Sequence, residues 1–154
     1  MKGRIALLLL LAATPAGAAF DANGVVLGSS EQQVKQYFPH ARCRALEWPS
    51  RAADRRCDDS RITFAGTEAR VTFYLRRDQV EGFDVRFRAS DFERVTNYFT
   101  TRYGKPADAS SAKLRKLEWS GQGERAALAL EADKRRGSLL VWRGDFYEEI
   151  YKVR

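Results

Sequence analysis

Apolar and polar side chains alternate along three consecutive segments in the middle of the chain, and this alternation constrains the fold more than any other sequence feature. The segments are 61–65, 69–76 and 80–88, and the short polar stretches Gly66–Thr67 and Arg77–Gln79 separate them. A period of two predicts strands with one buried face, and short connections predict that successive strands pair antiparallel. A parallel sheet is not expected, because its strands are covered on both faces and read as continuous apolar runs.

Two further segments have the spacing of amphipathic helices. Ser30 and Gln33 form a capping-box pattern ahead of the first, which ends at Pro39, while Ser90 and Glu93 form one ahead of the second, which ends at Gly104. Strands are also expected at 24–28, 114–119, 126–131 and 138–143, whereas residues 145–154 fit either a short helix or a docked tail. We therefore expect an α+β fold, with two helices packed on one face of an antiparallel β-sheet, in a single domain over residues 19–154.

A short tripeptide occurs twice. Leu46–Glu47–Trp48 follows the first predicted helix, and Leu117–Glu118–Trp119 follows the second. The shared order of helix, tripeptide strand and hairpin predicts two tandem units, at 24–88 and 89–154. Coincidence is the alternative, because three residues are a small sample.

The first residues have the pattern of a secretory signal peptide. Lys2 and Arg4 precede an uncharged apolar run over residues 5–13, and Ala16–Ala19 supplies small residues for a cleavage site. The run is shorter than the roughly 20 residues of a membrane-spanning helix, and no cysteine follows it to carry a lipid. We expect residues 1–18 to be removed and the remaining chain, without a transmembrane segment, to be periplasmic or secreted. Loss of Lys2 and Arg4 lowers the formal charge from +7 to +5, so the mature protein stays basic.

The two cysteines, Cys43 and Cys57, fit that compartment. An even number of cysteines in an exported chain predicts a disulfide, worth about 3 kcal/mol for a loop of this size. A catalytic redox pair would have the closer Cys-x-x-Cys spacing. A structural metal site needs four ligands, and the chain adds only one histidine, His40, to the two cysteines.

The sequence contains no recognisable catalytic pattern. It has no nucleophile elbow, phosphate-binding glycine loop or calcium loop, and the adjacent acids Asp58–Asp59 and Glu148–Glu149 point in different directions on a strand or helix. We therefore assign no catalytic residue, no metal and no cofactor. An enzyme assembled from distant residues stays open, and a deep pocket lined by His40 and converging acids would be its signature.

Alternation also predicts a basic face on the sheet. If Phe73, Phe83 and Phe87 are buried, a second set of side chains lies on the opposite face: Arg70, Tyr74, Arg76, Arg86 and Arg88. Arginine beside tyrosine suits an acidic protein or an anionic envelope component, whereas the predicted export argues against nucleic acid. The alternative is a solvated face whose arginine stems only cover the strands.

A resemblance to a known family rests on three short motifs: Val26–Ser30, Phe38–Pro39 and Tyr103–Pro106. They resemble the helix-then-sheet units of small exported bacterial proteins related to the SmpA/OmlA outer-membrane assembly component and the β-lactamase-inhibitor-like fold. The resemblance implies two helices over one face of an antiparallel sheet. The chain lacks the lipid-anchoring cysteine of the assembly component and has extra strands, so no functional residue is carried over.

These features predict a non-enzymatic binding or envelope-associated module, secreted or periplasmic, with an anionic partner. The alternative is a small periplasmic enzyme that acts on an anionic substrate.

Overall fold

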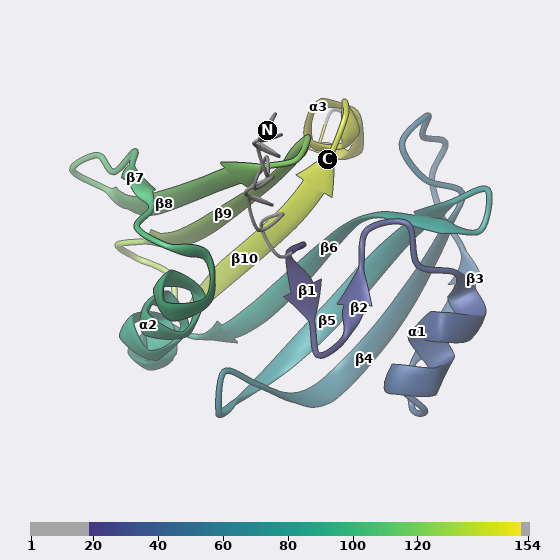
Figure 1. Ribbon diagram of the computed structural model, residues 1–154, viewed down its shortest axis with the longest axis horizontal. Helices are drawn as coiled ribbons and strands as arrows, with labels where there is room; N and C mark the ends of the chain where they lie inside the picture. The colour runs from purple at the N-terminus through teal and green to yellow at the C-terminus, as the bar shows by residue number, and fades with distance from the viewer. Residues whose placement is uncertain (1–18, 152–154) are drawn as a thin grey trace, which may run out of the picture.

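The computed structural model of the protein describes residues 19–151, so the expected signal peptide lies outside the described residues. One antiparallel sheet of eight strands dominates the fold, in the order β3–β4–β5–β6–β10–β9–β8–β7 (Figure 1). Its strands are β3 (Arg42–Ala45), β4 (Arg55–Phe64), β5 (Thr67–Arg76), β6 (Gln79–Arg88), β7 (Ala107–Asp108), β8 (Leu114–Gly121), β9 (Glu124–Glu131) and β10 (Arg136–Arg143). The other elements are the hairpin β1 (Asp21–Ala22) and β2 (Val25–Val26), the helices α1 (Glu31–Tyr37), α2 (Phe92–Tyr103) and α3 (Phe146–Tyr151), and the 3-10 turn η1 (Ala89–Asp91). The α+β class and the antiparallel sheet are confirmed.

The sheet is built from two successive runs of four strands, each preceded by a helix. The first run is β3 to β6 after α1, and the second is β7 to β10 after α2. The last strands of the two runs, β6 and β10, pair at the centre of the sheet. The two tripeptides do not occupy matching places in these runs, because Leu46–Trp48 lies in the loop after β3 whereas Leu117–Trp119 lies within β8. The predicted Leu-Glu-Trp strand of the first half is therefore wrong.

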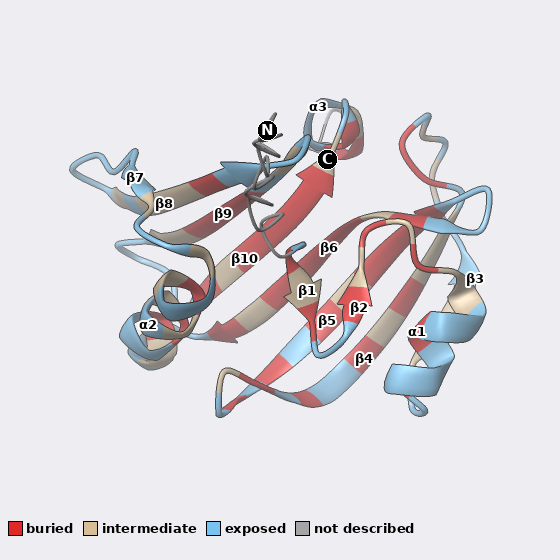
Figure 2. Cartoon of the chain, viewed as in Figure 1, coloured by how far each residue is buried: buried red, intermediate tan, exposed pale blue. Residues whose placement is uncertain are grey.

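One face of the sheet, which we call the inner face, carries the main hydrophobic core. Phe73 lies directly opposite Phe83 on the neighbouring strand, and both are fully buried together with Phe87. α1, α2 and the β1–β2 hairpin contribute side chains to the same cluster, including Val34 and Phe99. Buried residues concentrate on β5, β6 and β10, whereas α1 is mostly exposed (Figure 2). The apolar side chains of the alternating segments thus share one face, as predicted.

The opposite face, which we call the outer face, is covered at one end by α3 and by the loop between β3 and β4. Phe146 and Ile150 of α3 form a second buried cluster, in which the outer face supplies Tyr74, Leu140 and Trp142. The residues that the structure describes form three α-helices, one more than the two that were expected to pack on a single face of the sheet. The segment after residue 145, predicted as either a helix or a docked tail, is helical over Phe146–Tyr151.

The predicted helix starts differ in their outcome. At α1 the box is confirmed, since the Gln33 N–H donates to Ser30 Oγ at 3.2 Å and the Ser30 N–H donates to Gln33 Oε1 at 2.8 Å. At α2 the box is wrong, because Ser90 lies within η1 and Asp91 is the N-cap without a side-chain capping bond. The Asp91 carboxylate instead accepts hydrogen bonds from Thr67 and from Arg88, the latter at 3.3 Å. The chain therefore turns through η1 before α2 begins.

The segment between α1 and β5 contains more strand than predicted. β3 was not expected, and β4 begins at Arg55 rather than at residue 61. A register shift between Asp59 and Ile62 interrupts the alternation of apolar and polar residues. The first part of β4 therefore could not be predicted from alternation. The following turn is Ala65–Gly66, both with positive φ, rather than Gly66–Thr67.

No helix within residues 19–151 has both the length and the apolar character needed to cross a membrane.

Candidate functional site

The outer face divides into a covered end and an open end. At the covered end the Phe146 ring lies over Gly82, where an added Cβ would come within 2.6 Å of the ring. Tyr74 and Trp142 flank Gly82 on the neighbouring strands and are buried in the same cluster. Tyr74, predicted as part of an exposed basic patch, is therefore only 4% exposed and does not present its ring to a partner.

The structure brings together three of the predicted patch residues. Arg70 on β5 and Arg86 and Arg88 on β6 lie at the open end of the outer face. Arg76 lies at the other end of β5, where its guanidinium donates a hydrogen bond to the backbone carbonyl of Arg51. The predicted patch of five residues thus reduces to three neighbouring arginines.

A fourth arginine joins them from the second half of the chain. Strand register places Arg70 directly opposite Arg86, and Arg88 directly opposite Arg136 of β10. We call these four residues the arginine strip. Like charges directly opposite each other in a sheet destabilise it, so two successive arginine pairs are an unfavourable arrangement for the isolated fold.

Nearby carboxylates neutralise only part of the strip. Arg86 Nε donates to Asp84 Oδ2 at 2.9 Å, and Arg88 Nε donates to Asp91 Oδ2 at 3.3 Å. A hydrogen bond from Thr67, together with the charge of Arg88, lowers the pKa of Asp91, so this carboxylate stays ionised. Within the part of the chain that the structure describes, no salt bridge reaches Arg70 or Arg136.

A hollow of about 510 Å³ lies at one end of the strip, between η1 and the turn that joins β9 to β10. We call it the basic hollow. Its lining contains four basic side chains and no acidic one: Arg88, Ala89, Ser90, Lys134, Arg135 and Arg136. Residues 134–136 lie between the strands predicted at 126–131 and 138–143, and their part in the site was not predicted from the sequence. Three successive basic residues were the available signal, but only strand register shows that they meet Arg88.

A second hollow of about 430 Å³ lies at the other end of the strip, beside Arg70 and Arg86. Its charges are balanced, because three arginines and three aspartates line it. Asp58 accepts two hydrogen bonds from Arg56, at 2.9 and 2.7 Å, and one from Thr72 at 2.7 Å. Burial alone would raise the pKa of Asp58, but these hydrogen bonds outweigh it and the pKa is lowered. The Arg56 guanidinium in turn lies 5.9 Å from the centre of the Tyr74 ring.

His40 lines an adjoining hollow of about 640 Å³ at the edge strand β3, which shares Asp58, Asp59 and Ser60 with the second hollow. This is the combination expected for the alternative enzyme. The hydrogen bonds that hold Asp58 ionised against Arg56 leave it unsuited to act as a base for His40. His40 itself is exposed, so the hollow does not shield it from water.

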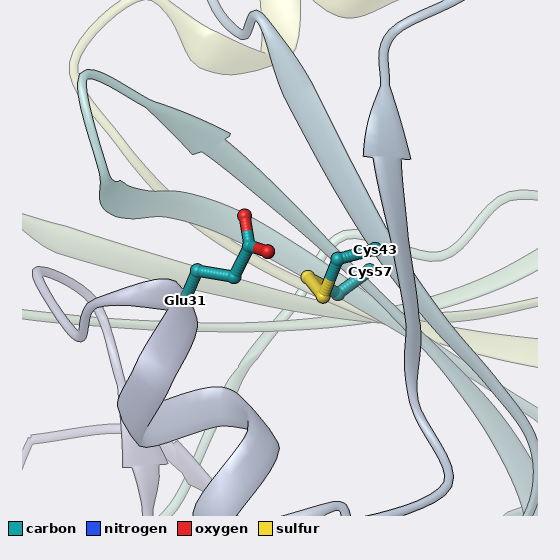
Figure 3. Close-up of side chains that lie close together, drawn as sticks. All are labelled: Glu31, Cys43 and Cys57. Carbon is teal, nitrogen blue, oxygen red and sulfur yellow. A yellow bond between two sulfur atoms is a disulfide. The ribbon is translucent and has the colours of Figure 1, made fainter.

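The predicted disulfide is confirmed between Cys43 and Cys57, which are directly opposite each other on β3 and β4. Figure 3 shows the Glu31 carboxylate beside the two sulfurs, and donor atoms of the three residues lie within 4.8 Å of one another. Each sulfur is bonded to the other, and Glu31 binds Arg55 at 2.7 Å and Lys35 at 2.9 Å. In the oxidised protein these donors are therefore committed to a disulfide and two salt bridges, not to a metal site.

No protein-family model, curated protein or solved structure matches this chain. Its function is therefore inferred from the geometry of the outer face.

Proposed function

We propose that the protein is a non-enzymatic binding module that holds an anionic partner against the arginine strip. The observation that carries this proposal is the pair of directly opposed arginine pairs, Arg70 with Arg86 and Arg88 with Arg136. Repulsion within each pair costs the isolated fold stability, and an anionic group lying between the two guanidinium groups offsets that cost. The absence of salt bridges to Arg70 and Arg136 among residues 19–151 supports this role, because their charges are open to a partner.

A periplasmic or secreted location is part of the proposal. The disulfide supports it, because such bonds persist in oxidising compartments. The signal-peptide pattern of residues 1–18 supports it independently.

The architecture also supports the proposal of two copies of one helix-plus-sheet unit and the resemblance to the SmpA/OmlA-like and β-lactamase-inhibitor-like proteins. Each run of four antiparallel strands follows one helix, and α1 and α2 both supply side chains to the inner core. In this view the arginine strip spans the junction of the copies, because Arg136 comes from the second and the other three arginines from the first.

Polyanion chromatography tests the proposed function. The double variant Arg70→Glu, Arg136→Glu reverses the two arginines of the strip that have no salt bridge in the described structure, so it breaks no internal ion pair. We expect it to elute from a sulfated-polysaccharide column at clearly lower salt than the control variant Arg77→Glu, Lys105→Glu. The control removes the same formal charge from exposed positions away from the strip. Equal elution of the two variants would show that retention follows net charge and that the strip has no special role.

One observation favours the alternative, a small enzyme acting on an anionic substrate, namely the hollow that His40 shares with Asp59 and Ser60. The matching test is turnover of phosphate and carboxylate esters by the oxidised protein and by its His40→Ala variant. If the native protein turns over such an ester and the variant does not, the protein is an enzyme and the proposed binding function is wrong.

A further inference from the structure

The basic hollow is assembled from two segments that are far apart in sequence. Strand β6 ends at Arg88 and leads into η1, while the β9–β10 turn arrives beside it from the second half of the chain. The Ala89 N–H donates to the Arg135 carbonyl at 2.9 Å, and Arg88 lies opposite Arg136 in the sheet. Backbone bonds on both sides therefore fix the relative positions of the two segments that carry the side chains around the hollow.

The charge around the hollow is strongly one-sided. Arg88, Lys134, Arg135 and Arg136 line it together with the hydroxyl-bearing Ser90, and none of its lining residues is acidic. Asp91 lies next to it and binds Arg88 through Nε, so that salt bridge does not use the two terminal nitrogens of Arg88. Asp133 belongs to the same turn but does not line the hollow. The side chains thus leave a large positive excess to be balanced by a ligand.

This arrangement selects one class of anion. A carboxylate offers two oxygens and a single charge, whereas a phosphomonoester offers three terminal oxygens and a charge of about −1.5 to −2 at neutral pH. Arginine guanidinium groups donate two parallel hydrogen bonds to phosphate oxygens, and lysine adds a point charge. Four cations and a hydroxyl around one space match the phosphomonoester better. The volume of about 510 Å³ leaves room for part of the group that carries the phosphate.

We propose that the basic hollow binds a phosphomonoester group presented on a larger molecule. This inference rests on the proposed function and names the chemistry that the arginine strip recognises: the phosphate lies in the hollow, and the rest of the partner extends along the strip towards Arg70. Two sources of this chemistry are distinguished by experiment, a soluble sugar phosphate and a phosphomonoester lipid in a membrane.

Calorimetric titration of the oxidised full-length mature protein with a sugar 1-phosphate tests the proposal. We expect saturable binding that strengthens between pH 5 and pH 8, because the ligand takes up its second negative charge with a pKa of about 6. The corresponding sugar sulfate, which carries one charge throughout, should bind more weakly and without this pH dependence. Arg136→Glu should weaken sugar-phosphate binding at least about tenfold, whereas the control Arg77→Glu, Lys105→Glu should bind like the native protein.

Vesicles containing a phosphomonoester lipid, compared with vesicles of a phosphodiester lipid at equal charge, form the second arm. Preferential binding to the phosphomonoester vesicles that is lost in Arg136→Glu would identify a membrane lipid as the source. Binding of the sugar phosphate without binding to these vesicles would identify a soluble source. Absence of binding in both arms, or sugar-phosphate binding unaffected by Arg136→Glu, overturns the proposal. The variant Arg70→Glu distinguishes failure of the phosphomonoester proposal from failure of the proposed polyanion binding by the strip. Arg70 does not line the basic hollow, so only polyanion retention should depend on it.

Discussion

The arginines of the outer face differ in whether a carboxylate on the same strand neutralises them. Arg56 is paired within its own strand to Asp58, and Arg86 in the same way to Asp84. Arg70 and Arg136 occupy equivalent outer positions without such a partner among residues 19–151. The difference separates arginines that are paired to a carboxylate on their own strand from arginines that have no salt bridge in the described structure.

The Arg56–Asp58 pair gives a pH-dependent prediction. Folding lowers the pKa of Asp58 below its ordinary value of 3.8. The ionised carboxylate therefore stabilises the folded state at pH values above 3.8, and this stabilisation is lost as the pH falls through the lower folded pKa. We expect Asp58→Asn to cost about 1–2 kcal/mol at pH 7, since hydrogen bonds to a charged, partly buried group are lost. Urea denaturation at pH 7, 5 and 3 should show the difference in stability between the native protein and the variant becoming smaller at the lowest pH. A difference that stays constant with pH would contradict the assignment.

Some residue positions on the outer face follow from the sequence and others do not. Alternation places Arg70, Arg86 and Arg88 on the outer face correctly, because side-chain direction in a strand follows from parity alone. It cannot show that Tyr74 is buried, because the covering residue Phe146 is distant in sequence. It also cannot show that Arg136 meets Arg88, since that contact depends on the register of β6 against β10.

At the scale of elements, the docking of α3 on the sheet depends on a glycine in β6, Gly82, which has no side chain. The Phe146 ring occupies the space above Gly82, and Cβ at that position would lie 2.6 Å from it. Because α3 is short, the helix rather than the sheet is expected to move when that space is filled.

Gly82→Ala should therefore displace α3 and destabilise the protein by about 1–3 kcal/mol. Hydrogen exchange should report faster exchange over Phe146–Tyr151. Gly121→Ala in β8 is the matched control, because nothing lies within 4 Å of a Cβ there. Combining Gly82→Ala with Phe146→Ala should cost less than the two single changes added together. Strict additivity would show that Gly82 and Phe146 do not determine the docking of α3.

The disulfide is the second element-scale feature, because it fixes the edge strand β3 to β4. Reduction of the native protein should lower the free energy of unfolding by about 3 kcal/mol, as expected for a loop of this length. Guanidinium denaturation with and without reductant measures this on identical side chains. Unchanged stability would mean that the pairing of β3 with β4 does not depend on the bond.

Several elements were predictable and others were not. The hairpins of β4 to β6 and the start of α1 follow from local patterns that the structure retains. The start of α2 does not, because Asp91 binds Thr67 and Arg88 instead of following the Ser90 box. β3 is short and exposed at most positions, so its sequence lacks the apolar alternation that identifies a strand.

For the whole molecule, the strand order determines where the candidate site lies. The two runs of strands meet through β6 and β10, which places Arg88 and Arg136 side by side at one end of the two central strands. The sequence predicts a basic outer face, but it cannot show which strands become neighbours or that α3 covers one end. Both features come from long-range packing.

We propose that the arginine strip lowers the stability of the fold and provides the binding surface. The double variant Arg70→Glu, Arg136→Glu tests both parts at once, because it turns each repelling pair into an attractive one. We predict that its free energy of unfolding is equal to or higher than that of the native protein, by up to about 1 kcal/mol per pair, while its affinity for a polyanion falls at least about tenfold. A variant that loses stability, or that binds the polyanion as well as Arg77→Glu, Lys105→Glu does, would contradict the account.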